Sequence, residues 1–129
     1  MSSFVVICDG GHDKSGGYGS FLIIGLASNK RAQVIEHKDR EPMGDITNNE
    51  AEYQALIESL RSLHEESGHG HHLLIISDSQ LMVRQLNGSY DAKNESLRAL
   101  RDEALDLLKG FTYDLQWTPR SMIVSVLNH

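Results

Sequence analysis

Three carboxylates stand out because each is expected at a position where a charged side chain is unfavourable unless it has a partner. Asp9 and Asp78 each follow an apolar run that is typical of a buried strand. Glu52 lies near the start of an amphipathic helical segment and leans toward its apolar face. A buried carboxylate costs free energy unless it is paired or binds metal. If the three converge, they form a site for a divalent cation, because hard cations prefer oxygen ligands.

Each carboxylate also has an ordinary structural explanation. Asp9 begins an Asp-Gly pair, which is common in turns. Asp78 could cap a helix that starts at Ser79. Glu52 could be a solvated residue near the positive end of its helix. All three explanations would have to hold together, so the metal site is the interpretation that we favour.

The first part of the chain predicts three strands that position Asp9. Apolar and alternating patterns indicate strands over residues 3–9, 18–28 and 31–38. Residues 10–17 and 29–30 are expected to be the turns between them. Short connections of this kind predict an antiparallel meander, with the first strand buried on both faces.

A helix over residues 47–66 is the clearest element, and it follows a loop expected over residues 41–46. Thr47 and Glu50 form a capping-box pattern at its start. Four residues at helical spacing define the core face: Tyr53, Leu56, Leu60 and Leu63.

The rest of the chain alternates between strands and helices. The expected elements are a strand over 72–77, helices over 79–86 and 95–109, and a strand over 111–117. Phe111 and Trp117 are expected in the core. Together the elements predict a single α/β domain over residues 1–129, with a five-stranded mixed sheet flanked by helices.

Composition limits the possible classes of protein. The chain has 129 residues, a hydrophobic fraction of 40% and one cysteine, which suits a single globular domain without an internal disulfide. No apolar run approaches the ~20 residues of a membrane span, and no signal peptide is apparent, so a cytoplasmic location is expected. The net charge of -6 with only 12 basic residues predicts weak, salt-dependent binding to any nucleic acid.

The motifs around the carboxylates resemble those of type 1 ribonuclease H, which cuts the RNA strand of RNA/DNA hybrids. The resemblance rests on Thr-Asn-Asn-x-x-Glu at residues 47–52, Ser-Asp-Ser-Gln at 77–80 and Trp-Thr-Pro-Arg at 117–120. It covers residues 3 to about 120. It implies a ribonuclease H-like fold, and a monomer that cleaves the hybrid with two Mg²⁺ or Mn²⁺ ions and leaves 5′-phosphate and 3′-hydroxyl ends.

The resemblance also assigns roles to individual residues. Asp9 would bridge both ions, and Glu52 and Asp78 would hold the ion at the leaving group. Arg120 would assist catalysis by positioning phosphate or releasing product. Six residues would contact or line the substrate groove: Gly10, Gly11, Asn48, Asn49, Ser79 and Gln80.

The C-terminal end departs from this family's pattern. The family has a fourth carboxylate there, whereas this chain has only apolar residues at the matching positions, Ile123, Val126 and Leu127. Asn128 is one position out of register and could be a neutral metal ligand. Residues 123–127 are expected to form a strand, so the family's C-terminal helix is expected to be absent. A segment missing between Met122 and the next residue would also explain this pattern.

The missing carboxylate leaves a second function open. A domain with the same fold could bind RNA/DNA hybrids with weakened or no cleavage. The acidic net charge argues against a strong binder of this kind.

Overall fold

The computed structural model describes residues 3–26, 32–68 and 70–127. One five-stranded sheet runs through the molecule in the order β3-β2-β1-β4-β5. Its strands are β1 (Ser3–Asp13), β2 (Gly16–Leu26), β3 (Ala32–Gly44), β4 (His72–Ser77) and β5 (Thr112–Trp117). β2 is antiparallel to β1 and β3, whereas β4 is parallel to both of its neighbours. The predicted mixed sheet, with an antiparallel meander at its start, is therefore confirmed.

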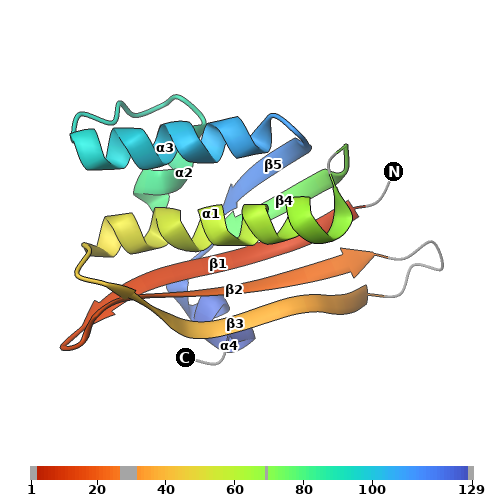
Figure 1. Cartoon of the computed structure of the whole chain (residues 1–129), viewed down its shortest axis with the longest axis horizontal. Coiled ribbons are helices and arrows are strands. Elements are labelled where there is room, and N and C mark those ends of the chain that lie inside the picture. The colour runs from red at the N-terminus through yellow and green to blue at the C-terminus, as the bar shows by residue number, and fades with distance from the viewer. Residues whose placement is uncertain (1–2, 27–31, 69, 128–129) are drawn as a thin grey trace.

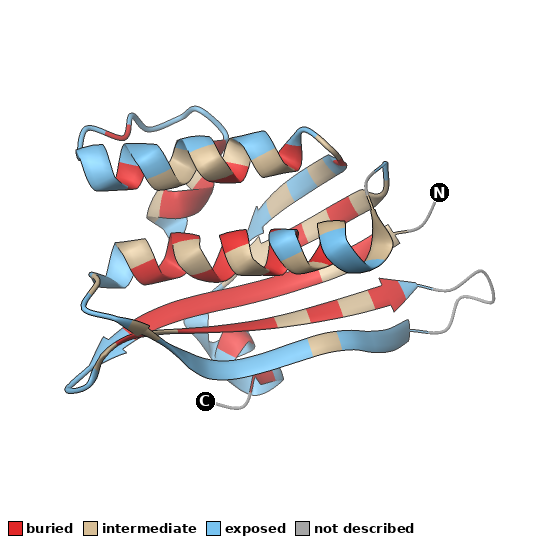
Figure 2. Cartoon of the chain, in the orientation of Figure 1, coloured by how far each residue is buried: buried red, intermediate tan, exposed pale blue. Residues whose placement is uncertain are grey.

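Four helices cover the sheet unequally. They are α1 (Asn48–Ser67), α2 (Gln80–Leu86), α3 (Glu95–Leu108) and α4 (Arg120–Leu127). Figure 1 shows α1 and α3 on one face of the sheet and α4 on the other. The main core lies between the sheet, chiefly β1, β2 and β4, and the helices α1 and α3 that cover its first face. β1 is the most continuously buried strand (Figure 2). None of the helices within the described ranges is long and apolar enough to cross a membrane.

Helix α1 begins as the sequence predicts. The Thr47 side chain accepts a hydrogen bond from the backbone N–H of Glu50, and the Glu50 side chain accepts one from the N–H of Thr47. This capping box satisfies two backbone donors that the helix itself leaves without partners. The predicted core face is also confirmed, since Tyr53, Leu56 and Leu60 are fully buried.

The first hairpin is longer than predicted. The turn expected over residues 10–17 is wrong, because β1 and β2 pair through this region and only Lys14 and Ser15 form the turn. The loop expected over residues 41–46 is also mostly strand, since β3 continues to Gly44. Pro42 is tolerated there because β3 is an edge strand whose register with β2 shifts nearby. The turn predicted at 29–30 lies outside the described residues.

The strand expected over residues 123–127 is wrong. Helix α4 occupies Arg120–Leu127 and so includes both Met122 and Ile123. Ile123 and Leu127, one helical turn apart, pack on Ile7 in a second core cluster under the sheet. This packing outweighs the local β-propensity of the apolar run. The expectation of no C-terminal helix is corrected as well, and no apolar tail pairs with the sheet over these residues.

Close packing of α1 on β1 depends on a glycine beside Asp9. A Cβ added at Gly10 would lie 2.3 Å from the backbone carbon of Ala51 and 2.3 Å from the backbone nitrogen of Glu52. No side chain fits at that distance, so Gly10 is what allows the helix to approach the strand. This approach places Glu52 next to Asp9.

We predict that Gly10→Ala destabilises the protein by about 1–3 kcal/mol, because the added methyl must push α1 away from β1. Urea unfolding followed by circular dichroism measures the change. Gly25→Ala is the matched control, since its Cβ would meet side chains and no backbone: Ile35 at 3.0 Å, which can move, and Phe4 at 3.4 Å, which is ordinary contact. Equal stability of Gly10→Ala and wild type would show that the helix and strand are not held as closely as described.

Candidate active site

The sheet brings Asp9 and Asp78 together at the end of β4. Strand β1 continues past Asp9, but its pairing with β4 ends at Ile7 and Ile76. Asp78 follows Ser77, the last residue of β4. Asp9 therefore lies on β1 just beyond the paired region, beside the point where the chain leaves β4. The two parallel strands position both carboxylates at one edge of the core.

Ser79 caps the next helix, so the capping explanation for Asp78 is wrong. The Ser79 hydroxyl accepts a hydrogen bond from the backbone N–H of Met82, at 3.2 Å, at the start of α2. The carboxylate of Asp78 is left to face the site. The solvated explanation for Glu52 is wrong too, because only 8% of this residue is exposed.

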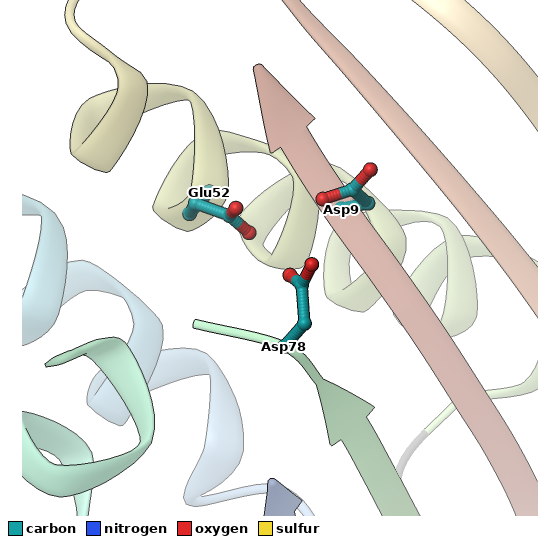
Figure 3. A group of neighbouring side chains, drawn as sticks. All are labelled: Asp9, Glu52 and Asp78. Atoms are coloured by element: carbon teal, nitrogen blue, oxygen red, sulfur yellow. The ribbon is translucent and has the colours of Figure 1, made fainter. Parts of the chain in front are cut away.

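The three carboxylates converge. Asp9, Glu52 and Asp78 each offer an oxygen, and these oxygens lie within 4.8 Å of one another. Figure 3 shows the side chains arriving from β1, α1 and the end of β4, with their carboxylates directed toward a common space. Among the described residues, Glu52 Oε2 and Asp78 Oδ1 are buried and accept no hydrogen bond. Such oxygens fit a divalent cation, which would supply the missing interaction.

The electrostatics of the site favour a proton on Glu52 when no cation is bound. Burial, followed by the nearby charges of Asp9 and Asp78, raises the pKa of Glu52 from 4.5 to about 9. Burial also raises the pKa of the Cys8 thiol, which the same three carboxylates raise further. A bound cation would displace the proton of Glu52, because it stabilises the charged carboxylate.

Arg120 is the cation that the chain itself places in the site. Its Nη1 donates a hydrogen bond to Asp78 Oδ2 at 3.1 Å and lies 3.6 Å from Asp9 Oδ1. Asp9 is the main reason that the pKa of Arg120 is raised. The structure thus brings the predicted Arg120 together with two of the three carboxylates.

Trp117 belongs to the site instead of the core. Its indole N–H donates to the backbone carbonyl of Asp78 at 3.1 Å, and 46% of the residue is exposed. Phe111, by contrast, is buried as predicted. The position of Trp117, three residues before Arg120 and at the end of a predicted strand, was the available signal. The partner of its indole N–H could not be found from sequence.

The residues predicted to contact substrate lie around the carboxylates in different settings. Gly10 and Gly11 are buried, and a Cβ at Gly11 would lie 2.4 Å from the ring of Tyr18. Three of the others, Asn48, Asn49 and Gln80, are exposed in the first turns of α1 and α2. Their substrate contacts stay predictions. Asn128, the predicted fourth metal ligand, lies outside the described residues.

The chain is similar in sequence to known proteins. A family described as reverse transcriptase-like matches residues 8–127. The chain belongs to this family. Ribonuclease HI of Halobacterium salinarum is 37% identical over 82 residues, which are 63% of this chain but only 40% of that protein. The similarity at the level of sequence therefore spans less than half of the curated relative.

Solved structures show the same fold. The crystal structure of RNase H1 from Halobacterium salinarum gives a TM-score of 0.76 at 27% identity, and covers 94% of this chain and 89% of that one. LC11-RNase H1, solved in complex with an RNA/DNA hybrid, also gives a TM-score of 0.76, at 21% identity, with 95% of this chain and 89% of that chain covered. The fold is that of type 1 ribonuclease H, as the motifs predict.

The raised pKa of Glu52 predicts how stability depends on pH in the metal-free protein. The folded protein keeps the proton up to a pH of about 9, whereas the unfolded chain loses it near 4.5. Because the folded state then binds more protons, stability falls as pH rises between these values. At 1.36 kcal/mol per pH unit, the loss between pH 4.5 and pH 7 is about 3 kcal/mol.

Glu52→Gln, which has no such proton to lose, should remove this part of the slope and be the more stable protein at pH 8. Urea unfolding with EDTA between pH 5 and pH 9 measures both. Parallel curves for the variant and wild type would contradict the assignment to Glu52.

Proposed function

We propose that this protein is an endoribonuclease that hydrolyses the RNA strand of RNA/DNA hybrids and leaves 5′-phosphate and 3′-hydroxyl ends. The observation that carries the proposal is the convergence of Asp9, Glu52 and Asp78, whose oxygens lie within 4.8 Å of one another. Membership of the family and the shared fold support the same reaction.

The carboxylates would bind Mg²⁺ or Mn²⁺, with two ions during catalysis. Such ions activate water and stabilise the charge that develops at a phosphodiester during hydrolysis. Asp9, with 1% of its surface exposed, would be the most rigid ligand, because it is buried on β1 where this strand pairs with Ser20 of β2. Glu52 and Asp78 contribute the buried oxygens that accept no hydrogen bond among the described residues. Trp117 holds the backbone of Asp78 and so orients its carboxylate.

The proposed substrate follows from the surface around the site. LC11-RNase H1 binds an RNA/DNA hybrid on the same fold. In this chain the exposed Asn48 and Asn49 offer amides that can bond to a 2′-hydroxyl or a phosphate. Arg120 is half-exposed beside Asp78 and can donate to a phosphate oxygen. We propose that the protein acts on the hybrid as a cytoplasmic monomer.

One observation favours a second function, that of a hybrid-binding module with weakened or no cleavage. Helix α4 carries no acidic side chain, so the described residues supply three carboxylates to the site and not four. A metal held by fewer charged ligands binds more weakly, which lowers the fraction of protein ready for catalysis.

Cleavage of a labelled RNA/DNA hybrid with Mg²⁺ or Mn²⁺ tests the proposal. We predict that Asp78→Asn lowers the rate at least about a hundredfold, as does the loss of other groups that stabilise charge in a transition state. The control is Asp114→Asn on β5, since 75% of the Asp114 side chain is exposed and it pairs with His72. Rates for Asp114→Asn should match wild type.

The two functions give different results in this experiment. Wild type that binds the hybrid but cuts neither strand with either metal would favour the binding module. Equal cleavage by wild type and Asp78→Asn would overturn the proposed site.

A further inference from the structure

The position of Arg120 has a consequence for the metal-free protein. Its guanidinium bonds to Asp78 Oδ2 at 3.1 Å and lies 3.6 Å from Asp9 Oδ1. These are two of the three carboxylates that would hold the cation. One unit of positive charge, supplied by the chain, thus already offsets part of their repulsion.

We propose that Arg120 is a built-in competitor of the divalent cation, which holds Asp9 and Asp78 in the metal-free protein and must leave them when the cation binds. This inference rests on the metal site of the proposed function. It goes further because it makes residue 120 a determinant of how much metal the protein needs. A guanidinium and a divalent cation held by the same two carboxylates would repel each other strongly.

Arg120 can leave without a change of fold. It is the first residue of α4, and 58% of its side chain is exposed. Ile123 and Leu127 anchor the helix in the core under the sheet. The N–H of Thr118 bonds to the carbonyl of Ser77 at 3.0 Å, which fixes the preceding loop to β4. The backbone is therefore held at both ends, and the side chain alone has room to swing toward solvent.

Arg120 does not contact two of the oxygens that could bind the cation. Arg120 contacts Oδ2 of Asp78, whereas Oδ1 of Asp78 and Oε2 of Glu52 are the buried oxygens without hydrogen bonds among the described residues. A cation can bind first at these two oxygens and then take over Asp9. Its double charge interacts with the carboxylates more strongly than a single guanidinium does.

Manganese binding without substrate tests the inference. Isothermal titration calorimetry with MnCl₂ should show that Arg120→Gln binds Mn²⁺ about tenfold more tightly than wild type, the effect expected of removing one unit charge near a divalent ion. Arg120→Lys keeps the charge and should bind more like wild type than Arg120→Gln does. Arg61→Gln is the matched control, because it removes the same charge from an exposed ion pair with Glu103 on the helix layer.

Thermal unfolding separates competition from a structural role. In EDTA, Arg120→Gln should have a lower Tm than wild type, because Asp9 and Asp78 lose their counter-ion. Saturating Mn²⁺ should raise the Tm of this variant by more than it raises that of wild type. Unchanged or weaker Mn²⁺ binding by Arg120→Gln would overturn the inference, even with a lower Tm in EDTA. Equal tightening by Arg120→Gln and Arg120→Lys would overturn it too.

The test stands apart from the test of cleavage. If the hybrid is not cut but Arg120→Gln binds Mn²⁺ more tightly, the competition holds and the proposed nuclease activity fails. If the hybrid is cut but the variants bind Mn²⁺ equally, only the competition fails.

Discussion

The close contact between α1 and β1 is the constraint on which the site depends. It exists because residue 10 has no side chain, so the backbone of Ala51 and Glu52 can lie directly over the strand. The core residues of α1 pack against the sheet, and this packing also brings Glu52, on the same helix, close to Asp9. Hydrophobic burial thus holds in place carboxylates that would separate in water.

The resulting charge distribution explains the chemistry of the site. Three carboxylates lie together with little solvent around them, which raises the pKa of Glu52 to about 9. A proton, an arginine or a metal ion can each relieve the repulsion. In the metal-free protein the first two do so, at Glu52 and through Arg120 respectively. Metal binding, as proposed, would therefore be an exchange in which the proton leaves Glu52 and the side chain of Arg120 moves away.

Helix α4 contributes to the site by positioning Arg120, its first residue. It supplies no carboxylate, but it fixes the origin of Arg120 by burying Ile123 and Leu127 against the underside of the sheet. Trp117 and Thr118 tie the preceding loop to the end of β4. The end of the described chain thus delivers a positive charge to the site, where the family pattern has a negative one.

The sequence by itself determined the three carboxylates, the capped helix α1 and the mixed sheet, because these depend on local patterns. Thr47 and Glu50 are three residues apart, and the apolar runs that precede Asp9 and Asp78 are contiguous. Only the tertiary structure decided the length of the first hairpin and the helical state of residues 120–127. Strand pairing extended the first hairpin. Burial against Ile7 favoured a helix at residues 120–127, although the local β-propensity favours a strand. The contacts of Arg120 and Trp117 with Asp78 also join residues about 40 apart in the chain, and no local pattern encodes them.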